Sequence, residues 1–356
     1  MMKRFQKILA IDIGAGTQDI LFYDSHLTPE NCISLILPTP TRYFAKVIEE
    51  CQQDLFLDGD PIGGGAVSSC IRKHISKGYR VVMSESAAYT VRNNLSEVES
   101  HGIEISRYEE LTTGVKRVRL TEINLPLLKG FLSHYGEDLE ADLIALAVQD
   151  HGTPPQGTSN REFRFQQIEE RLLENNNPES FVYARDEIPP YFKRMAGIAR
   201  SAHKQSNGEV FLMDTAFAAI LGCMEESGSA LFVNVGNSHT LAALICDNKI
   251  LGLLEHHTGC LTTEKLDTLL TKFQRGVISS REVLEDGGHG AVVLPDYRAD
   301  NCEEIVVTGP NRGLLEQSVL NVRFAAPYGN MMLTGPFGLV KGAFLKAGIN
   351  QTAPEL

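Results

Sequence analysis

A pattern of three short apolar runs joined by tight turns occurs twice in the sequence. Each run has the length of a strand and is bounded by turn residues, which predicts a β-strand rather than a helix. In both copies, alternating helical and strand-like segments follow the three runs. This repetition predicts two similar α/β halves with hairpins at equivalent places. The six runs are residues 7–13, 18–24, 31–37, 229–235, 239–246 and 249–255.

The length of the chain also favours two domains. Its 356 residues exceed the roughly 250–300 residues at which a single hydrophobic core stops growing. The repeat places the boundary near residue 205, which gives domains at 1–205 and 206–356 with a cleft between them. We expect the final apolar helix, near 335–347, to pack back on the first domain.

The composition excludes several classes of protein. A formal net charge of -12 argues against nucleic-acid binding, which depends on clustered cations. Asp12 interrupts the first apolar run, so a signal peptide is not expected. No run approaches the roughly 18 apolar residues of a membrane span. We therefore expect a cytoplasmic protein without a nucleic-acid or membrane partner.

The cysteines do not form a recognisable metal or cluster motif. They are widely spaced, with neither a CxxC pair nor the CxxxCxxC run of a radical iron-sulfur enzyme. Their odd number and spacing argue against a disulfide framework. We expect reduced, mostly structural thiols and no iron-sulfur chemistry within one chain. The seven residues are Cys32, Cys51, Cys70, Cys223, Cys246, Cys260 and Cys302.

The turn between the first and second strand of each copy suits phosphate binding. Residues 12–19 (DIGAGTQD) and 234–240 (NVGNSHT) are rich in small residues, so successive backbone N–H groups can form an anion-binding nest. Thr17 and Thr240 add hydroxyl donors, and Asp12 ends a strand where it can hold a divalent cation through water. Two ordinary glycine hairpins are the alternative, but their equivalent positions favour phosphate binding.

These tracts resemble the first and second phosphate motifs of the actin, sugar-kinase and heat-shock-ATPase superfamily. The resemblance implies an α/β fold of two ribonuclease-H-like domains, each a mixed sheet with three leading antiparallel strands and flanking helices, around a central nucleotide cleft. It also implies ATP and Mg2+ as cofactors, with Asp12 as the metal-binding and catalytic carboxylate. An adenosine-side motif is expected at 306–313 (VVTGPNRG) and a small-residue helix at 335–342. The implied nucleotide contacts are Gly14, Ala15, Gly16, Thr17, Gln18, Asp19, Asn234, Gly236, Asn237, Ser238, His239, Thr240, Gly309, Pro310, Asn311 and Gly335.

Two further resemblances concern the branch of this superfamily. Residues 214–222 (DTAFAAILG) are similar to the apolar small-residue helix of hydantoinase and oxoprolinase subunits. The whole chain also resembles a prokaryotic family labelled as related to the pyruvate formate-lyase activating enzyme, although the cysteine run that this label requires is absent. Asn234 departs from the superfamily, which usually has an Asp there. Because an amide carries no charge, this change weakens the case for metal binding through the second domain and for hydrolysis.

Asp150 is the candidate catalytic base. It follows a buried apolar run at 142–148 and resembles the sugar-kinase Asp that accepts a proton from the acceptor hydroxyl. A loop-capping carboxylate is the alternative, and the sequence leaves both open. The resemblance implies that insertions such as 86–135 and 151–205 build the acceptor pocket. Within the second of these, the polar helix at 160–174 is expected to be a solvated face.

Five histidines invite comparison with metal sites. Neighbouring residues of a strand point to opposite faces, so His256 and His257 should not share one ion while extended. No spacing among the histidines matches a zinc pattern, which favours hydrogen-bonded or exposed side chains over ligation. A second functional interpretation treats His151, His256 and His257 as contacts to substrate or phosphate. The five residues are His151, His239, His256, His257 and His289.

The sequence therefore predicts a protein that uses ATP in phosphoryl transfer to a small molecule or in its ATP-coupled hydrolysis, with Asp12, Thr17 and Asp150 central. A nucleotide-sensing module is the alternative, in which Asn234 marks lost turnover. A third possibility is that neither turn binds nucleotide. The identity of the small molecule and the oligomeric state do not follow from the sequence.

Overall fold

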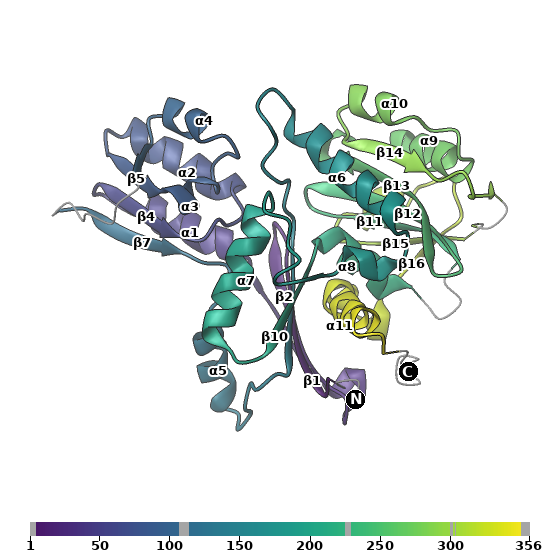
Figure 1. The fold of residues 1–356 in the computed structure, drawn as a ribbon, viewed down its shortest axis with the longest axis horizontal. Helices are drawn as coiled ribbons and strands as arrows, with labels where there is room; N and C mark the ends of the chain where they lie inside the picture. Colours follow the sequence, from purple (N-terminus) through teal and green to yellow (C-terminus); the bar gives the residue numbers. More distant parts are fainter. Residues whose placement is uncertain (1–4, 107–113, 225–228, 300–301, 303, 350–356) are drawn as a thin grey trace.

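The computed structural model describes residues 5–106, 114–224, 229–299, 302 and 304–349. Its strands form two six-stranded sheets and one four-stranded sheet. In Figure 1 the four-stranded sheet and its helices lie on one side, and the second six-stranded sheet lies on the other. Within the described ranges, no helix is long and apolar enough to cross a membrane.

The first six-stranded sheet contains the first predicted trio of strands. Its order is β3-β2-β1-β8-β10-β9. β1, β2 and β3 are antiparallel neighbours, whereas β8 and β10 continue the sheet parallel to β1. The bounds are β1 Lys7–Ile13, β2 Thr17–Asp24, β3 Ile33–Pro38, β8 Leu143–Val148, β9 Tyr183–Ala184 and β10 Glu209–Met213.

The second six-stranded sheet repeats this arrangement. Its order is β14-β13-β12-β11-β15-β16, with β11 to β13 antiparallel and β15 and β16 parallel to β11. The five strands that start from β13 therefore match those that start from β3 in order and direction, which confirms the two predicted ribonuclease-H-like domains. The bounds are β11 Ala230–Val235, β12 His239–Cys246, β13 Lys249–His257, β14 Gly290–Val293, β15 Ile305–Thr308 and β16 Val322–Phe324.

An α/β subdomain is inserted between β3 and β8. Its sheet has the order β6-β5-β4-β7, and every neighbouring pair is parallel. It has its own apolar core, which includes Leu57, Ile71 and Met83. The insertion therefore begins well before residue 86, where the sequence placed it. The bounds are α1 Pro40–Glu49, β4 Leu55–Gly59, α2 Gly65–Ser76, β5 Val81–Ser84, α3 Glu85–Ala88, α4 Leu95–Ser100, β6 Glu104–Ser106 and β7 Lys116–Leu120.

Helices cover the outer face of each six-stranded sheet. α5 (Leu125–Ser133) and α7 (Lys193–Gln205) pack against the first sheet through residues such as Leu128 and Ile198. α9 (Thr263–Gln274) and α10 (Ser280–Glu285) pack against the second through residues such as Phe273.

Two helices fill the space between the sheets. α8 (Thr215–Cys223) and α11 (Thr334–Lys346) contact each other closely, and α11 also contacts β1, β2 and β8. A Cβ atom on Gly222 would lie 1.9 Å from the Thr334 carbonyl oxygen, and one on Gly338 would lie 1.7 Å from the Ala218 carbonyl oxygen. Glycine at both positions thus allows the two helices to approach backbone to backbone.

The structure differs from the sequence expectation at β10 and at α6. β10 lies beyond residue 205, so the first sheet continues past the expected boundary. α6 (Asn160–Glu174) has the expected bounds but is not a solvated face, because Phe163, Arg164 and Ile168 are buried. α6 contacts β13 and β14 of the second sheet. The helix therefore joins the two domains.

Candidate functional site

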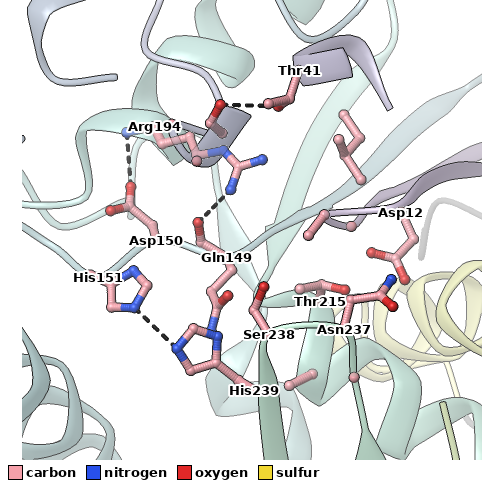
Figure 2. Close-up of a pocket in the computed structure, with 18 of the residues that line it drawn as sticks. Asp12, Thr41, Gln149, Asp150, His151, Arg194, Thr215, Asn237, Ser238 and His239 are labelled. Atoms are coloured by element: carbon pink, nitrogen blue, oxygen red, sulfur yellow. Dashed lines mark hydrogen bonds between the residues drawn. The ribbon is translucent and has the colours of Figure 1, made fainter. Parts of the chain in front are cut away.

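A cavity of about 600 Å³ lies between the domains. Both predicted turns, the insertion and the start of α11 contribute to its wall (Figure 2). Gly16, Gln18, Thr240, Asn311 and His256 are predicted site residues that do not line it. The predicted residues that do line it are Asp12, Gly14, Ala15, Thr17, Asp19, Asp150, His151, Asn234, Gly236, Asn237, Ser238, His239, His257, Gly309, Pro310 and Gly335.

The two turns have the same backbone hydrogen bond. Gly14 N–H donates to the Thr17 carbonyl oxygen at 3.0 Å, and Gly236 N–H donates to the His239 carbonyl oxygen at 3.0 Å. The turns also meet each other, because a Cβ atom on Gly16 would lie only 2.7 Å from Asn237 Nδ2. Both turns thus lie at the same cavity, as the anion-nest interpretation requires.

Two carboxylates face each other across the β1–β2 hairpin. Asp12 and Asp19 are directly paired in the antiparallel register, and both are buried. Like charges at such a pair destabilise a sheet. Among the described residues, neither Asp12 Oδ1 nor Asp19 Oδ1 has a hydrogen-bond partner. The pair is therefore short of positive charge.

The pKa values of these carboxyl groups reflect that shortage. Burial raises the pKa of Asp12 to about 8, opposed by a hydrogen bond from Thr215 and supported by the charges of Asp19 and Asp214. Burial raises the pKa of Asp19 to about 7, although the Thr17 hydroxyl donates to its Oδ2 at 3.3 Å. A divalent cation that prefers oxygen ligands would favour the ionised form of both carboxyl groups. The residues present therefore fit Mg2+.

The second turn is held by the segment in which the sequence predicts an adenosine-side motif. Asn311 Nδ2 donates to the Gly236 carbonyl oxygen at 2.9 Å, which explains why Asn311 supports the turn instead of lining the cavity. Gly309 has a φ of 100°, and a Cβ atom there would lie 2.7 Å from Asn234 Oδ1. The Thr240 hydroxyl is fully buried and lies 3.0 Å from the Thr258 hydroxyl, and Thr240 does not line the cavity.

Asp150 makes the backbone hydrogen bonds expected of the loop-capping alternative. Its Oδ1 accepts from Gly152 N–H at 2.9 Å, and its Oδ2 accepts from Arg194 N–H at 2.8 Å and Met195 N–H at 3.0 Å. Burial raises the pKa of Asp150, and these backbone hydrogen bonds oppose the rise. The carboxylate thus joins the loop after β8 to the start of α7.

Sequence reasoning missed two groups at the cavity. Thr215 begins α8, and its side chain makes a hydrogen bond to Asp12. Arg194 Nη1 donates to the Gln149 carbonyl oxygen at 2.7 Å, and Arg194 Nη2 contacts Glu122 Oε1 at 2.6 Å. Glu122 Oε1 also accepts from Gly63 N–H at 3.0 Å. Arg194 and Glu122 therefore fasten the insertion to the first domain, a long-range contact with no local sequence signal.

The predicted histidine contacts separate into two groups. His151 and His257 line the cavity, whereas His256 is buried with Nε2 at 3.1 Å from Asp286 Oδ2. His256 and His257 thus face opposite sides of β13, as strand geometry predicts. In Figure 2, His151 and His239 face each other, with their Nε2 atoms 3.4 Å apart.

Solved structures with low sequence identity resemble the chain over most of its length. Ethanolamine utilization protein EutJ from Carboxydothermus hydrogenoformans has 11% identity and a TM-score of 0.36, covering 95% of this chain and 90% of that one. The inorganic polyphosphate/ATP-glucomannokinase from Arthrobacter sp. strain KM has 12% identity and a TM-score of 0.36, covering 95% and 99%. MreB5 of Spiroplasma citri bound to ADP has 10% identity and a TM-score of 0.37, covering 97% and 99%. At these TM-scores, the fold assignment rests on the strand order.

Sequence comparison identifies the family. No curated protein matches the chain. Residues 62–314 match the family model described as "Putative pyruvate format-lyase activating enzyme (DUF1786)". This match spans most of the chain and includes the second turn, Asp150 and the histidines at the cavity. The chain therefore belongs to the DUF1786 family.

Proposed function

We propose that the cavity binds ATP with Mg2+ and transfers the γ-phosphoryl group to a small molecule that carries a carboxylate. The paired carboxylates of Asp12 and Asp19, at the base of one of two facing turns, are the observation that carries the proposal. They need a cation, and the turns offer backbone donors for the phosphates that the cation would accompany.

Asp12 and Asp19 hold Mg2+ in this proposal. Mg2+ is usually bound through one or two carboxylates together with substrate phosphates and water. Bound there, it would neutralise charge on the transferring phosphoryl group. Gly335 allows this arrangement because a Cβ atom at that position would lie 1.9 Å from Asp12 Oδ2.

The phosphates lie between the two turns, and the adenosine lies toward β15 and the start of α11. Gly14, Gly236 and Ser238 of the turns line the cavity, and so do Pro310, which follows β15, and Met332, which precedes α11. Small residues and backbone groups dominate the phosphate end. Binding there needs no cluster of cations, which is compatible with an acidic chain.

The acceptor side carries positive charge. Arg42, Arg92 and Lys193 line the cavity from α1, the segment after α3 and the start of α7. Cations at this side favour an anionic substrate group. A carboxylate is already ionised at neutral pH, so it can attack without a general base. That chemistry suits a site whose Asp150 is engaged by three backbone N–H groups.

The step forms one bond and breaks one. A carboxylate oxygen of the acceptor attacks the γ-phosphorus of ATP, and the bond from that phosphorus to the bridging oxygen breaks. The products are an acyl phosphate and ADP, and no proton is transferred. Water can then hydrolyse the acyl phosphate, or a second nucleophile can consume it.

The test combines binding with chemical trapping. Calorimetry with ATP and Mg2+ should show binding that is lost in Asp12→Ala. ADP release should then be screened against a panel of carboxylic acids with hydroxylamine present, which converts an acyl phosphate to a hydroxamate. A carboxylic acid that stimulates ADP release and yields the matching hydroxamate supports the proposal. Stimulation by alcohols without hydroxamate would reject the carboxylate acceptor, and absence of ATP binding would reject the whole proposal.

A nucleotide sensor is the second candidate, and Asn234 is the observation that favours it. Its side chain is buried beside Gly309, where a carboxylate would have placed a second charge close to the phosphates. A sensor binds ATP but does not release ADP, whichever acceptor compound is added. Single-turnover measurement of ADP formation separates the two candidates.

A further inference from the structure

A cluster of imidazoles lies at the edge of the cavity, apart from the Asp12–Asp19 pair. The ligand-capable atoms of His151, His239 and His289 all lie within 4.8 Å of one another. His151 follows β8 of the first domain, His239 begins β12, and His289 precedes β14. Three segments that are distant in sequence therefore bring their imidazoles together.

The hydrogen bonding of this cluster is incomplete. His289 is fully buried, and within the described part of the chain neither of its ring nitrogens has a hydrogen-bond partner. His239 is also buried, and its Nδ1 lacks a partner in the same residues. Leaving a buried N–H or ring nitrogen unsatisfied is unfavourable. Two such buried rings beside His151 would not be expected to gather without a ligand for their nitrogens.

The spacing suits a tetrahedral ion. His151 Nε2 and His239 Nε2 are 3.4 Å apart. Two imidazole nitrogens bound to tetrahedral zinc are separated by about 3.3 Å, given zinc–nitrogen distances of about 2.0–2.1 Å. The third nitrogen is near enough to join them by a change of side-chain torsion.

Buried charges around the cluster complete the arrangement. Glu255 Oε2 lies 4.0 Å from His289 Nδ1. A carboxylate is thus on the Nδ1 side of the ring, as in many metal-binding histidines, and Nε2 is left for an ion. Arg164 contacts both Glu255 and Asp214, and Arg161 Nη1 donates to the Gly288 carbonyl oxygen. The Arg164 guanidinium is thus balanced by two carboxylates.

We infer that His151, His239 and His289 form a binding site for a divalent transition-metal ion of the zinc type. Three imidazoles without a thiolate suit zinc or its neighbours in the series. His151 and His239 line the cavity, so the fourth position is open to water or to an oxygen of a bound anion. Because the ligands come from both domains, the ion would hold the two sides of the cleft together. This site does not depend on the proposed use of ATP.

The test uses the metal alone. Full-length protein is stripped with a chelator and titrated with Co2+, whose visible absorption reports tetrahedral coordination, and bound Co2+ is then displaced with Zn2+. We expect one ion per chain. His289→Gln and His151→Gln should each weaken binding at least tenfold, whereas the surface variant His203→Gln should bind as the wild type does. Binding that is absent from the wild type, or unchanged in His289→Gln, would overturn the site.

Two controls keep the outcome decisive. Loss of binding in His289→Gln with full binding in His151→Gln would reject the bridging of the domains. If the variants do not fold, X-ray absorption at the zinc edge of the wild-type protein replaces them. It should show nitrogen neighbours at about 2.0–2.1 Å with the outer scattering of imidazole, and sulfur neighbours would refute the assignment.

Discussion

Replacing Gly335 with Ala tests the position of Asp12 without touching the carboxylate itself. Gly335 is the second residue of α11, and its backbone does not require glycine because its φ is not in the left-handed region. An added Cβ atom would nevertheless lie 1.9 Å from Asp12 Oδ2 and 2.6 Å from Asp12 Cγ. Either the carboxylate or the helix must move by at least about 1.5 Å to reach an ordinary contact.

A shift of this size has a calculable consequence. Misplacing a positioned group by about 1 Å costs up to about 100-fold in function. We therefore expect Gly335→Ala to weaken binding of a nonhydrolysable ATP analogue with Mg2+ by about 10- to 100-fold, or about 1.4–2.7 kcal/mol. Overpacking should also lower the free energy of unfolding by about 1–3 kcal/mol.

The matched control is Gly130→Ala, in the middle of α5. No described atom lies within 4 Å of a Cβ atom there. This change should raise the free energy of unfolding by about 0.5–1 kcal/mol, because alanine is the better helix former, and should leave binding unchanged. Calorimetry and thermal unfolding measure both effects. If Gly335→Ala binds the analogue with Mg2+ as tightly as Gly130→Ala does, Asp12 is not a metal ligand.

Four further predictions concern the same cavity. The raised pKa values of Asp12 and Asp19 mean that protons must leave before Mg2+ binds, so Mg2+ affinity should rise with pH by roughly tenfold per unit for each proton released and level off above about pH 8; a flat profile from pH 6 to 9 in Mg2+ titrations would contradict this. In the metal-free protein the free energy of unfolding should change with pH in the opposite direction. The stability that protonated Asp12 contributes is present at low pH and is lost as pH rises through about 8. Asp150→Asn should lower the free energy of unfolding by about 1–3 kcal/mol, because backbone hydrogen bonds are lost, and should change kcat only a few-fold. A loss of about 100-fold or more in kcat would instead show that Asp150 acts as the general base. Asn234→Asp should increase ADP release by about tenfold or more if the amide limits turnover, and an unchanged single-turnover rate would show that it does not.

Local pattern predicted the strands of the two domains well. The runs at 7–13 and 239–246 coincide with β1 and β12, and the helix at 160–174 coincides with α6. These elements are specified by residues that are close in sequence, including short apolar runs and turn residues at their ends. The equivalent turns were predictable for the same reason.

Tertiary contacts decided what the pattern could not. α6 is polar in sequence, but its Arg164 is buried against Glu255 of β13, and a pairing between such distant residues leaves no periodic signal. The parallel sheet of the insertion depends on pairing among strands separated by helices. Asp150 was ambiguous because capping and catalysis use the same residue at the same place in a loop.

The histidines illustrate this limit most clearly. No two of His151, His239 and His289 are near each other in sequence, so a search by ligand spacing could not group them. Glycines were an indirect signal. Gly290 has a φ of 154°, and a Cβ atom there would lie 2.4 Å from Phe165, which shows that the loop carrying His289 is packed tightly against α6.

A crystal structure with a nonhydrolysable ATP analogue and Mn2+ in place of Mg2+ tests the central claim most directly. Anomalous scattering locates the ion without reference to the protein chain. We expect the phosphates between the turn at Gly14–Thr17 and the turn at Gly236–His239, with the Mn2+ peak beside Asp12 and Asp19. A nucleotide bound elsewhere, or an ion remote from both carboxylates, would contradict the account.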